Sequence, residues 1–134
     1  MDLYLIARRT TDMEKALAFY VGVLGFEKTH EVRMGARHIV YVGPSSRAWA
    51  FQLILDGGAP PAVDRGEFVG LETDAFEAEL ARLQQKNVPI DGPHVLPGGA
   101  SYAFLDDPDG HRIRLIEKTG FLRGGVHGTA GPAR

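Results

Sequence analysis

The sequence predicts an α+β fold in which the order strand, helix, strand, strand, strand occurs twice. Apolar residues recur at helical spacing in two places, after Thr11 and after Asp74, and each helical segment has one strand-like run before it and three after it. A tight turn at Asp107-Pro108-Asp109-Gly110 leads into the last of these runs, because proline fixes φ and glycine allows a positive φ. Residue identity between the two halves is low, so it is the order of elements that repeats.

The first half predicts one helix between strands. Residues 3–7 are apolar throughout, as in a strand that is covered on both faces. Thr11 and Glu14 predict a capping box for the helix, and Gly22 and Gly25 are expected to end it. The helix carries one buried stripe, predicted to consist of Met13, Ala16, Leu17, Tyr20 and Leu24. Three strands are predicted next, over residues 26–34, 38–42 and 49–55.

The second half repeats this order after a linker rich in glycine and proline, residues 56–65. Residues 68–73 predict a strand, and a helix that carries Phe76, Leu80 and Leu83 is predicted after it. Asp74 and Glu77 are expected to cap that helix, and Asn87-Val88-Pro89 is expected to end it. The remaining strands are predicted around residues 90–95, 101–105 and 112–117.

The composition is that of a single domain, which we place at residues 1–117. The chain has 134 residues, of which 44% are hydrophobic, enough for one core but not for two independent ones. A formal net charge of −2 gives no electrostatic footprint for nucleic acid, and the absence of cysteine excludes disulfides and thiolate sites. The N-terminus does not resemble a signal peptide and no apolar run approaches membrane-spanning length, so we expect a cytoplasmic protein without a membrane partner. Residues 118–134 are expected to form a glycine-rich tail, mobile beyond about Leu122.

Two segments resemble the glyoxalase / bleomycin-resistance / dioxygenase superfamily, whose members are also called vicinal oxygen chelate proteins. One is the turn and strand from Asp107 to Glu117, and the other is the helical segment from Asp12 to Phe26. The resemblance covers residues 3–117. It implies two tandem βαβββ modules, about residues 3–55 and 66–117, that form a curved mixed sheet around a cleft.

The resemblance also implies where a metal ion would be bound. Metal-dependent members hold a divalent ion with His or Gln, Glu, His and Glu at four equivalent strand positions. In this chain the four positions fall on Leu5, Gln52, Phe68 and Arg114. Leucine and phenylalanine have no lone pairs to donate, a single amide oxygen is a weak ligand, and arginine is a permanent cation. We therefore expect neither the usual metal nor any other cofactor.

The histidines offer no replacement for these ligands. None of the five falls on one of the four positions. His30 and His38 flank the turn at Gly35 and come nearest to a metal-binding pair. His111 lies in the Asp107–Gly110 turn segment and is predicted to be a solvated turn residue.

Arg114 most needs an explanation among the residues of the last strand. Alternation places Arg112 and Arg114 on the face opposite Ile113, and a guanidinium facing a sheet-lined cavity is costly to leave unpaired. One hypothesis is a structural salt bridge to Glu72 or a neighbouring acid. The other is a small ligand with a carboxylate, phosphate or carbonyl group, which Arg114 binds with help from Gln52 and Arg112.

The rest of the predicted ligand face is mostly apolar. Leu5 contributes to it, and Phe68 offers a ring for stacking. Tyr102 or Phe104 would add an aromatic wall, depending on which face of its strand each side chain occupies.

These observations support three hypotheses for function. The first is a metal-independent protein that binds a small organic ligand, similar to the bleomycin-resistance type, which protects by sequestering a drug. The second is an enzyme. It would be a lyase, isomerase or cyclase in which Glu72 performs acid–base chemistry and Arg114 is an electrophilic anchor, or a glyoxalase-like or dioxygenase enzyme with a displaced metal site. The third is a degenerate partner domain within an assembly. A homodimer is expected, because the resemblance implies half-closed sheets with bare edge strands.

Overall fold

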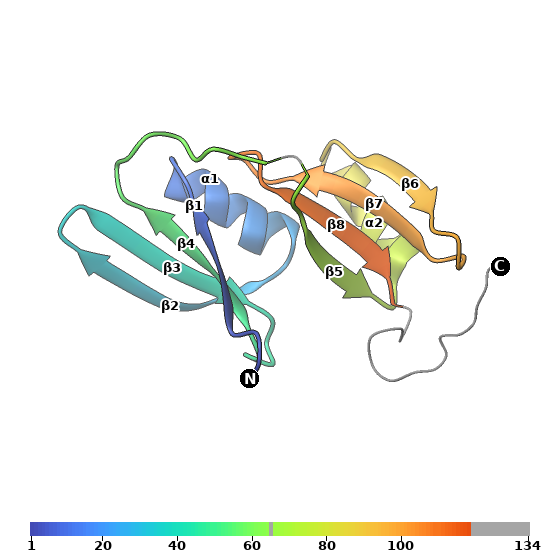
Figure 1. Ribbon diagram of the computed structural model, residues 1–134, viewed down its shortest axis with the longest axis horizontal. Helices are drawn as coiled ribbons and strands as arrows, with labels where there is room; N and C mark the ends of the chain where they lie inside the picture. The colour runs from blue at the N-terminus through green and yellow to red at the C-terminus, as the bar shows by residue number, and fades with distance from the viewer. Residues whose placement is uncertain (65, 119–134) are drawn as a thin grey trace. The chain divides into compact units, whose positions relative to one another are not determined.

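A computed structural model of the chain describes residues 1–64 and 66–118 (Figure 1). The chain forms two compact units. The first unit consists of Met1–Asp64 together with the turn Asp107–His111. The described residues of the second unit are 66–106 and 112–118, which lie before and after that turn. The predicted mobile tail lies almost entirely outside the described residues. No helix in the described ranges is long and apolar enough to cross a membrane.

The first unit is a four-stranded mixed sheet with one helical segment. Its strands are ordered β1-β4-β3-β2; β1 is parallel to β4, and the other neighbours are antiparallel. In chain order the elements are β1 (Leu5–Arg9), α1 (Met13–Leu17), the π-helical η1 (Ala18–Val23), β2 (Glu27–Met34), β3 (Arg37–Gly43) and β4 (Ala50–Leu55).

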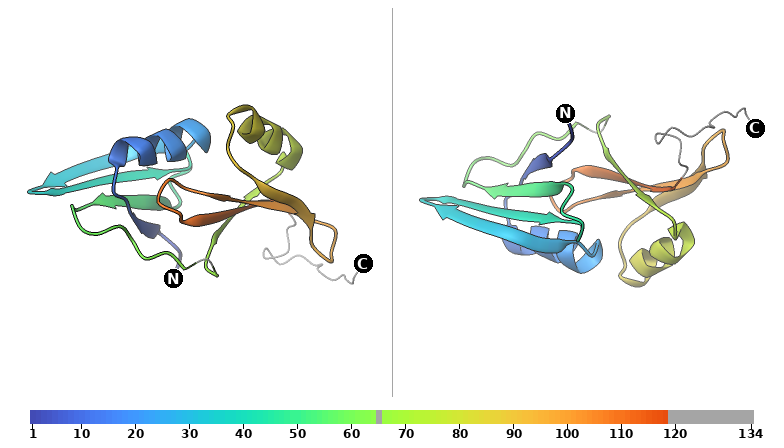
Figure 2. Two further views of the ribbon diagram at one scale, coloured as in Figure 1. Left: turned by 90° about the horizontal axis from the view of Figure 1, so that it is seen from above. Right: turned by 90° about the horizontal axis from the view of Figure 1, so that it is seen from below.

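The second unit repeats this topology. Its sheet has the order β5-β8-β7-β6, again with one parallel pair, β5 and β8, and two antiparallel pairs. The elements are β5 (Val69–Thr73), α2 (Phe76–Gln85), β6 (Asp91–Val95), β7 (Ser101–Asp106) and β8 (Arg112–Glu117). Each helix lies on one face of the sheet in its own unit (Figure 2). The predicted α+β fold with two βαβββ modules is therefore confirmed.

The core of the first unit lies between the helical segment and β3 and β4. Tyr20 and Phe51 are fully buried, with ring centroids 4.8 Å apart. Trp49 packs edge-on against Phe51 at 5.3 Å, which extends the cluster toward the end of the sheet. Aromatic pairs in this geometry stabilise a core beyond the area that they bury.

The predicted helix stripe is shifted by a change of helix type. Leu24 donates its backbone N–H to the carbonyl of Phe19, five residues earlier, which is the spacing of a π-helix. The wider turn brings Phe19 into the core, whereas Leu17 and Leu24 are only half-buried. Gly22 lies inside this segment and does not end it, contrary to prediction. Gly25, with φ +85°, follows its last turn.

Both predicted helix N-caps were wrong. Asp12, not Thr11, caps α1, and its carboxylate accepts the N–H of Lys15 at 3.1 Å. Thr11 is unavailable because it is bound to Asp109 through both its N–H and its hydroxyl. Before α2, the backbone N–H of Ala75 donates to the Thr73 hydroxyl at 3.0 Å. Ala75 stands at the N-cap position without a side-chain cap, so the predicted Asp74–Glu77 box is not formed.

The predicted end of α2 is confirmed. Asn87 adopts φ +60°, its N–H bonds to the carbonyl of Gln84, and Val88 bonds to Leu83. These two bonds are the pair that ends a helix in a Schellman motif, and asparagine tolerates the left-handed conformation that the motif requires.

Among the strands that begin later than predicted, β1 and β5 matter for the predicted site residues. β1 starts at Leu5 and extends to Arg9, because Leu3 and Tyr4 remain exposed and the pairing with β4 begins at Leu5. β5 starts at Val69, so that Phe68 precedes the strand and is 41% exposed.

Candidate functional site

Strand β8 presents two arginines on the uncovered face of the second sheet. Ile113 is buried on the face that α2 contacts, so the alternation of the strand turns Arg112 and Arg114 to the opposite face. In the register, Arg114 lies between Gly70 of β5 and Phe104 of β7. There is open space where a side chain at Gly70 would begin. Arg114 therefore has an aromatic neighbour on one side and room on the other.

Among the described residues, Arg114 contacts aromatic rings and forms no ion pair with an acidic side chain. Its guanidinium carbon lies 4.8 Å from the centroid of the Phe68 ring and 5.6 Å from that of Tyr102. Its Nε is buried without a hydrogen-bond partner, and no donor of its guanidinium is used by another described residue. The predicted salt bridge to Glu72 is not formed. Glu72 pairs in register with Ile116, two positions further along β8.

Arg112 forms an ion pair with an acidic side chain, whereas Arg114 forms none with any described residue. It donates to Oδ2 of Asp91 at 2.7 Å and lies over the ring of Phe104, 4.3 Å from its centroid. The other carboxylate oxygen of Asp91 is 2.9 Å from Nε2 of His94. The hydrogen bond from His94, followed by that from Arg112, lowers the pKa of Asp91 against the opposing effect of desolvation. Arg112 is thus a paired residue and a less available anion anchor than predicted.

Three aromatic rings form a continuous row on this face. Phe68 meets Phe104 at 5.2 Å with the ring planes 76° apart, and Phe104 meets Tyr102 at 5.8 Å with the planes 85° apart. We call Phe68, Phe104 and Tyr102 the aromatic row. Both candidates for the predicted aromatic wall therefore occupy the same face as Arg114, because they alternate with the buried Ala103.

A hollow of about 290 Å³ lies beside Phe104, the middle ring of the aromatic row. Phe104, Arg112 and Asp91 line it, with Pro89, Ile90 and Asp106 around them. Its volume is near the lower end of the range for small-molecule pockets. The charges of Arg112 and Asp91 in its wall are already paired with each other.

The remaining predicted site residues lie in the first unit. Leu5 pairs with Ala50, and Gln52 lies between Ala7 and Tyr41. The side-chain amide of Gln52 donates to the hydroxyl of Tyr41 at 2.8 Å. Since Gln52 and Arg114 belong to different units, the predicted cooperation between them stays a prediction.

The four positions at which relatives bind a metal do not suit one here. Leu5 and Phe68 offer no donor atom, Gln52 offers a single amide oxygen, which is a weak ligand, and Arg114 brings a positive charge. Across residues 1–64 and 66–118, no group of three or more His, Cys, Asp or Glu side chains could hold a metal ion. The donor set does not fit the ion.

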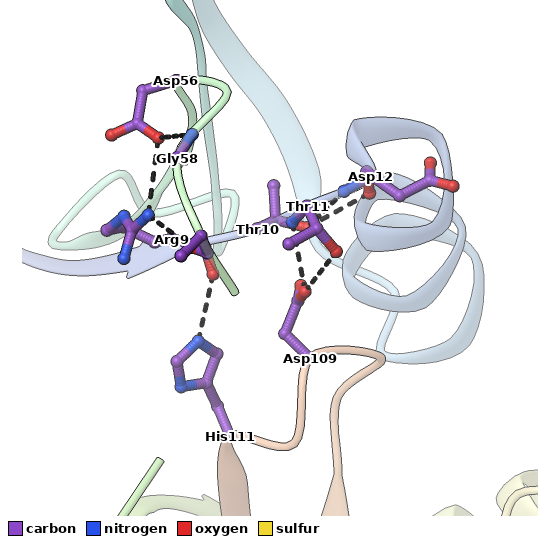
Figure 3. A network of polar contacts seen from close by, with 9 residues as sticks. Arg9, Thr10, Thr11, Asp12, Asp56, Gly58, Asp109 and His111 are labelled. Carbon is purple, nitrogen blue, oxygen red and sulfur yellow. Dashed lines mark hydrogen bonds and ion pairs between the residues drawn. The ribbon is translucent and has the colours of Figure 1, made fainter. Parts of the chain in front are cut away.

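The described histidines contact other parts of the chain, and His127 lies outside the described residues. His38 binds Glu31 through Nε2 at 2.5 Å, and the His30 ring lies 5.8 Å from that of Tyr41. His111 is not the solvated turn residue that we expected, because its Nε2 lies 3.1 Å from the carbonyl oxygen of Arg9 (Figure 3). A carbonyl accepts only, so this nitrogen carries the proton.

The turn between β7 and β8 is bound to the first unit. Asp109 accepts the N–H and the hydroxyl of Thr11, each at 3.1 Å, beside the His111 contact to Arg9 (Figure 3). Asp107 accepts the Tyr20 hydroxyl at 2.7 Å, and both residues are buried. Burial and the neighbouring Asp107 raise the pKa of Tyr20. These contacts position the turn.

The sequence did not indicate the partners that distinguish the two arginines. Asp91 lies 21 residues before Arg112, in a strand interrupted by an irregularity in its pairing, so no local spacing connects them. The pairing of Gln52 with Tyr41 was missed as well. Residues that lie opposite each other on neighbouring antiparallel strands interact, and this rule could have indicated the pair.

Known proteins of one superfamily are similar to this chain in sequence and in structure. The profile of the Glyoxalase/Bleomycin resistance protein/Dioxygenase superfamily matches residues 3–115. Lactoylglutathione lyase of Salmonella typhimurium is 30% identical over 125 residues, which cover 87% of this chain and 92% of the enzyme. The crystal structure of TnmS3, an antibiotic binding protein from Streptomyces sp. CB03234, is similar with a TM-score of 0.73 and 28% identity over 89% of this chain and 97% of that one. A glyoxalase/bleomycin resistance protein from the same organism has a TM-score of 0.68 and 28% identity over 85% and 98%.

Proposed function

Because this chain belongs to the glyoxalase/bleomycin resistance protein/dioxygenase superfamily, we propose that it binds a small organic molecule without a metal ion and does not convert it. The observation that carries the proposal is the pair Phe68 and Arg114. Two positions that would supply metal ligands in relatives hold instead a ring and a cation that stack at 4.8 Å. Such a pair suits an organic ligand, since it offers a stacking surface and hydrogen-bond donors together.

The finer proposal is sequestration of a drug-like compound. It is supported by the similarity to an antibiotic binding protein over nearly the whole of both chains. Sequestration requires affinity alone, and a mostly apolar face with few polar anchors supplies it. The uncovered face of the second sheet has this character, with three rings and one unpaired guanidinium.

An enzymatic function is the second candidate, and the identity to lactoylglutathione lyase favours it. Without the metal, proton transfer would fall to Glu72 and ligand polarisation to Arg114. The two residues occupy neighbouring pairs of the β5–β8 register, Gly70 with Arg114 and Glu72 with Ile116. A ligand bound to Arg114 would therefore be near the carboxylate. Activity that depends on Glu72 would support this candidate over binding alone.

Metal analysis tests the proposal directly. The purified protein is expected to contain far less than one equivalent of any divalent metal, and Ni²⁺, Zn²⁺, Mn²⁺ and Fe²⁺ should not raise its melting temperature above that of a magnesium control. A ligand that prefers the folded state must stabilise it, so a screen of drug-like compounds should give thermal shifts where the metals do not. One equivalent of tightly held metal, lost with activity on chelation, would contradict the proposal.

A further inference from the structure

The two arginines of β8 differ in a way that defines the ligand more closely. We propose, resting on the proposed binding function, that the uncovered face of the second sheet selects planar aromatic compounds with a single carboxylate, which binds Arg114 while the ring stacks on the aromatic row.

The charges allow for one anion. Arg112 already has its counterion, because Asp91 accepts from it at 2.7 Å. Arg114 has no ion pair with any described residue, and all five of its N–H donors are unused there. A ligand with one negative charge completes the pairing on this face. A ligand with two would leave a desolvated charge unmatched, which is unfavourable.

The donors of Arg114 suit a carboxylate. Its guanidinium carbon lies over the rings of Phe68 and Tyr102, 4.8 and 5.6 Å from their centroids. Its Nε is buried, so the two terminal nitrogens are the donors that a ligand reaches. Two parallel N–H groups match the two oxygens of a carboxylate, and a lysine ammonium does not reproduce this fork.

The neighbouring surface favours a flat ring. Phe68 is 41% exposed, and Phe104 and Tyr102 continue the row from it. Gly70, the β5 partner of Arg114, has open space above its backbone, so a ring is able to approach the sheet closely beside the guanidinium. An aliphatic acid of similar size would keep the charge contact but lose the stacking.

A probe series with one scaffold separates charge from shape. Calorimetric titration of the full chain with 2-naphthoate, 2-naphthamide, trans-decalin-2-carboxylate and naphthalene-2,6-dicarboxylate varies one property at a time. We expect 2-naphthoate to bind most tightly. Loss of the charge in the amide should weaken binding roughly 10- to 150-fold, the range of a charge-assisted hydrogen bond. The decalin acid and the dicarboxylate should each bind more weakly than 2-naphthoate.

Variants assign the effect to Arg114. Arg114→Ala should weaken 2-naphthoate by the same roughly 10- to 150-fold and leave 2-naphthamide nearly unchanged, and Arg114→Lys should recover only part of the loss. Arg82→Ala is the matched control. It removes one arginine of the same unit from α2, where the side chain is paired with Glu79, and should leave both probes unaffected.

The outcomes distinguish this inference from the proposed function. Equal binding of acid and amide, or an Arg114→Ala variant that binds 2-naphthoate as tightly as the parent, overturns the ligand class while small-molecule binding stands. If no naphthyl probe binds at millimolar concentration, the ligand class is likewise wrong. The proposed function itself is refuted by different results, namely a tightly bound metal ion or turnover of a ligand that depends on Glu72.

Discussion

The buried bond between Tyr20 and Asp107 gives the sharpest test of how this fold is held. Tyr20→Phe removes one hydroxyl and leaves the ring, so the contacts with Phe19 at 5.1 Å and Phe51 at 4.8 Å are retained. Asp107 keeps two backbone bonds to Oδ1, from Asp109 at 2.9 Å and His111 at 2.8 Å. Its Oδ2 loses the Tyr20 hydroxyl, which donates at 2.7 Å.

The size of the effect follows from the burial of both partners. Tyr20 is fully buried and Asp107 is 6% exposed, so water does not readily replace the lost donor. A hydrogen bond to a carboxylate contributes about 1.5–3 kcal/mol, and an unsatisfied buried acceptor puts the cost in the upper part of this range. We expect Tyr20→Phe to lower the free energy of unfolding by about 2–3 kcal/mol, or the melting temperature by roughly 8–12 °C for a chain of this length.

Urea denaturation with a matched control measures this change. Tyr41→Phe also removes a tyrosine hydroxyl, but one that is half-buried and accepts a neutral bond from Gln52. It should cost about 0.5–1 kcal/mol, with the same dependence of unfolding free energy on urea. If the free energies of unfolding of the two variants differ by less than about 0.5 kcal/mol, the Tyr20–Asp107 bond does not stabilise the fold as argued from its burial.

Two further predictions concern a glutamate of the first sheet and the oligomeric state of the protein. Hydrogen bonds from Lys28 and then His38 lower the pKa of Glu31 to about 2. When the pKa of a carboxyl group is lower in the folded state, its ionised form stabilises the protein at pH values above the usual pKa of glutamate. This stabilisation is lost as the pH falls toward 2. Glu31→Gln should therefore flatten the fall in melting temperature over this acid range, and an unchanged pH profile would contradict the assignment. In the described part of the chain each sheet ends in two edge strands, β1 and β2 in the first and β5 and β6 in the second, so we also predict a homodimer. Light scattering at micromolar concentration should give twice the monomer mass of 14.6 kDa, and the monomer mass alone would refute this.

Local patterns predicted the fold well where neighbouring residues decide the structure. The turn at Asp107–Gly110 is closed by the bond from the Gly110 N–H to the Asp107 carbonyl, with Gly110 at φ +91°. The end of α2 at Asn87 is equally local. The start of α1 is not, because the choice between Thr11 and Asp12 as the cap is settled by Asp109, 98 residues away. Long-range contacts of this kind leave no periodic signal in the sequence.

The candidate site was predictable to the same extent. Alternation along β8 was enough to place Arg112 and Arg114 on one face, and the structure agrees. Which of them is free could not be predicted, because the answer depends on Asp91. The irregular pairing of β6 sets the position of Asp91 relative to β7, and single-sequence patterns do not reveal such an irregularity.

The assignment of residues 107–111 to the first unit also limits how the chain can be divided. The repeat of elements suggests two autonomous halves that a gene duplication could have joined. A fragment ending at Asp64 would nevertheless lack the carboxylate that accepts the buried Tyr20 hydroxyl and the one that binds Thr11. The complementary fragment would carry a turn whose side chains have lost their partners. The two modules therefore depend on each other. A fragment, permuted chain or module swap that contains the first module must also contain this five-residue turn.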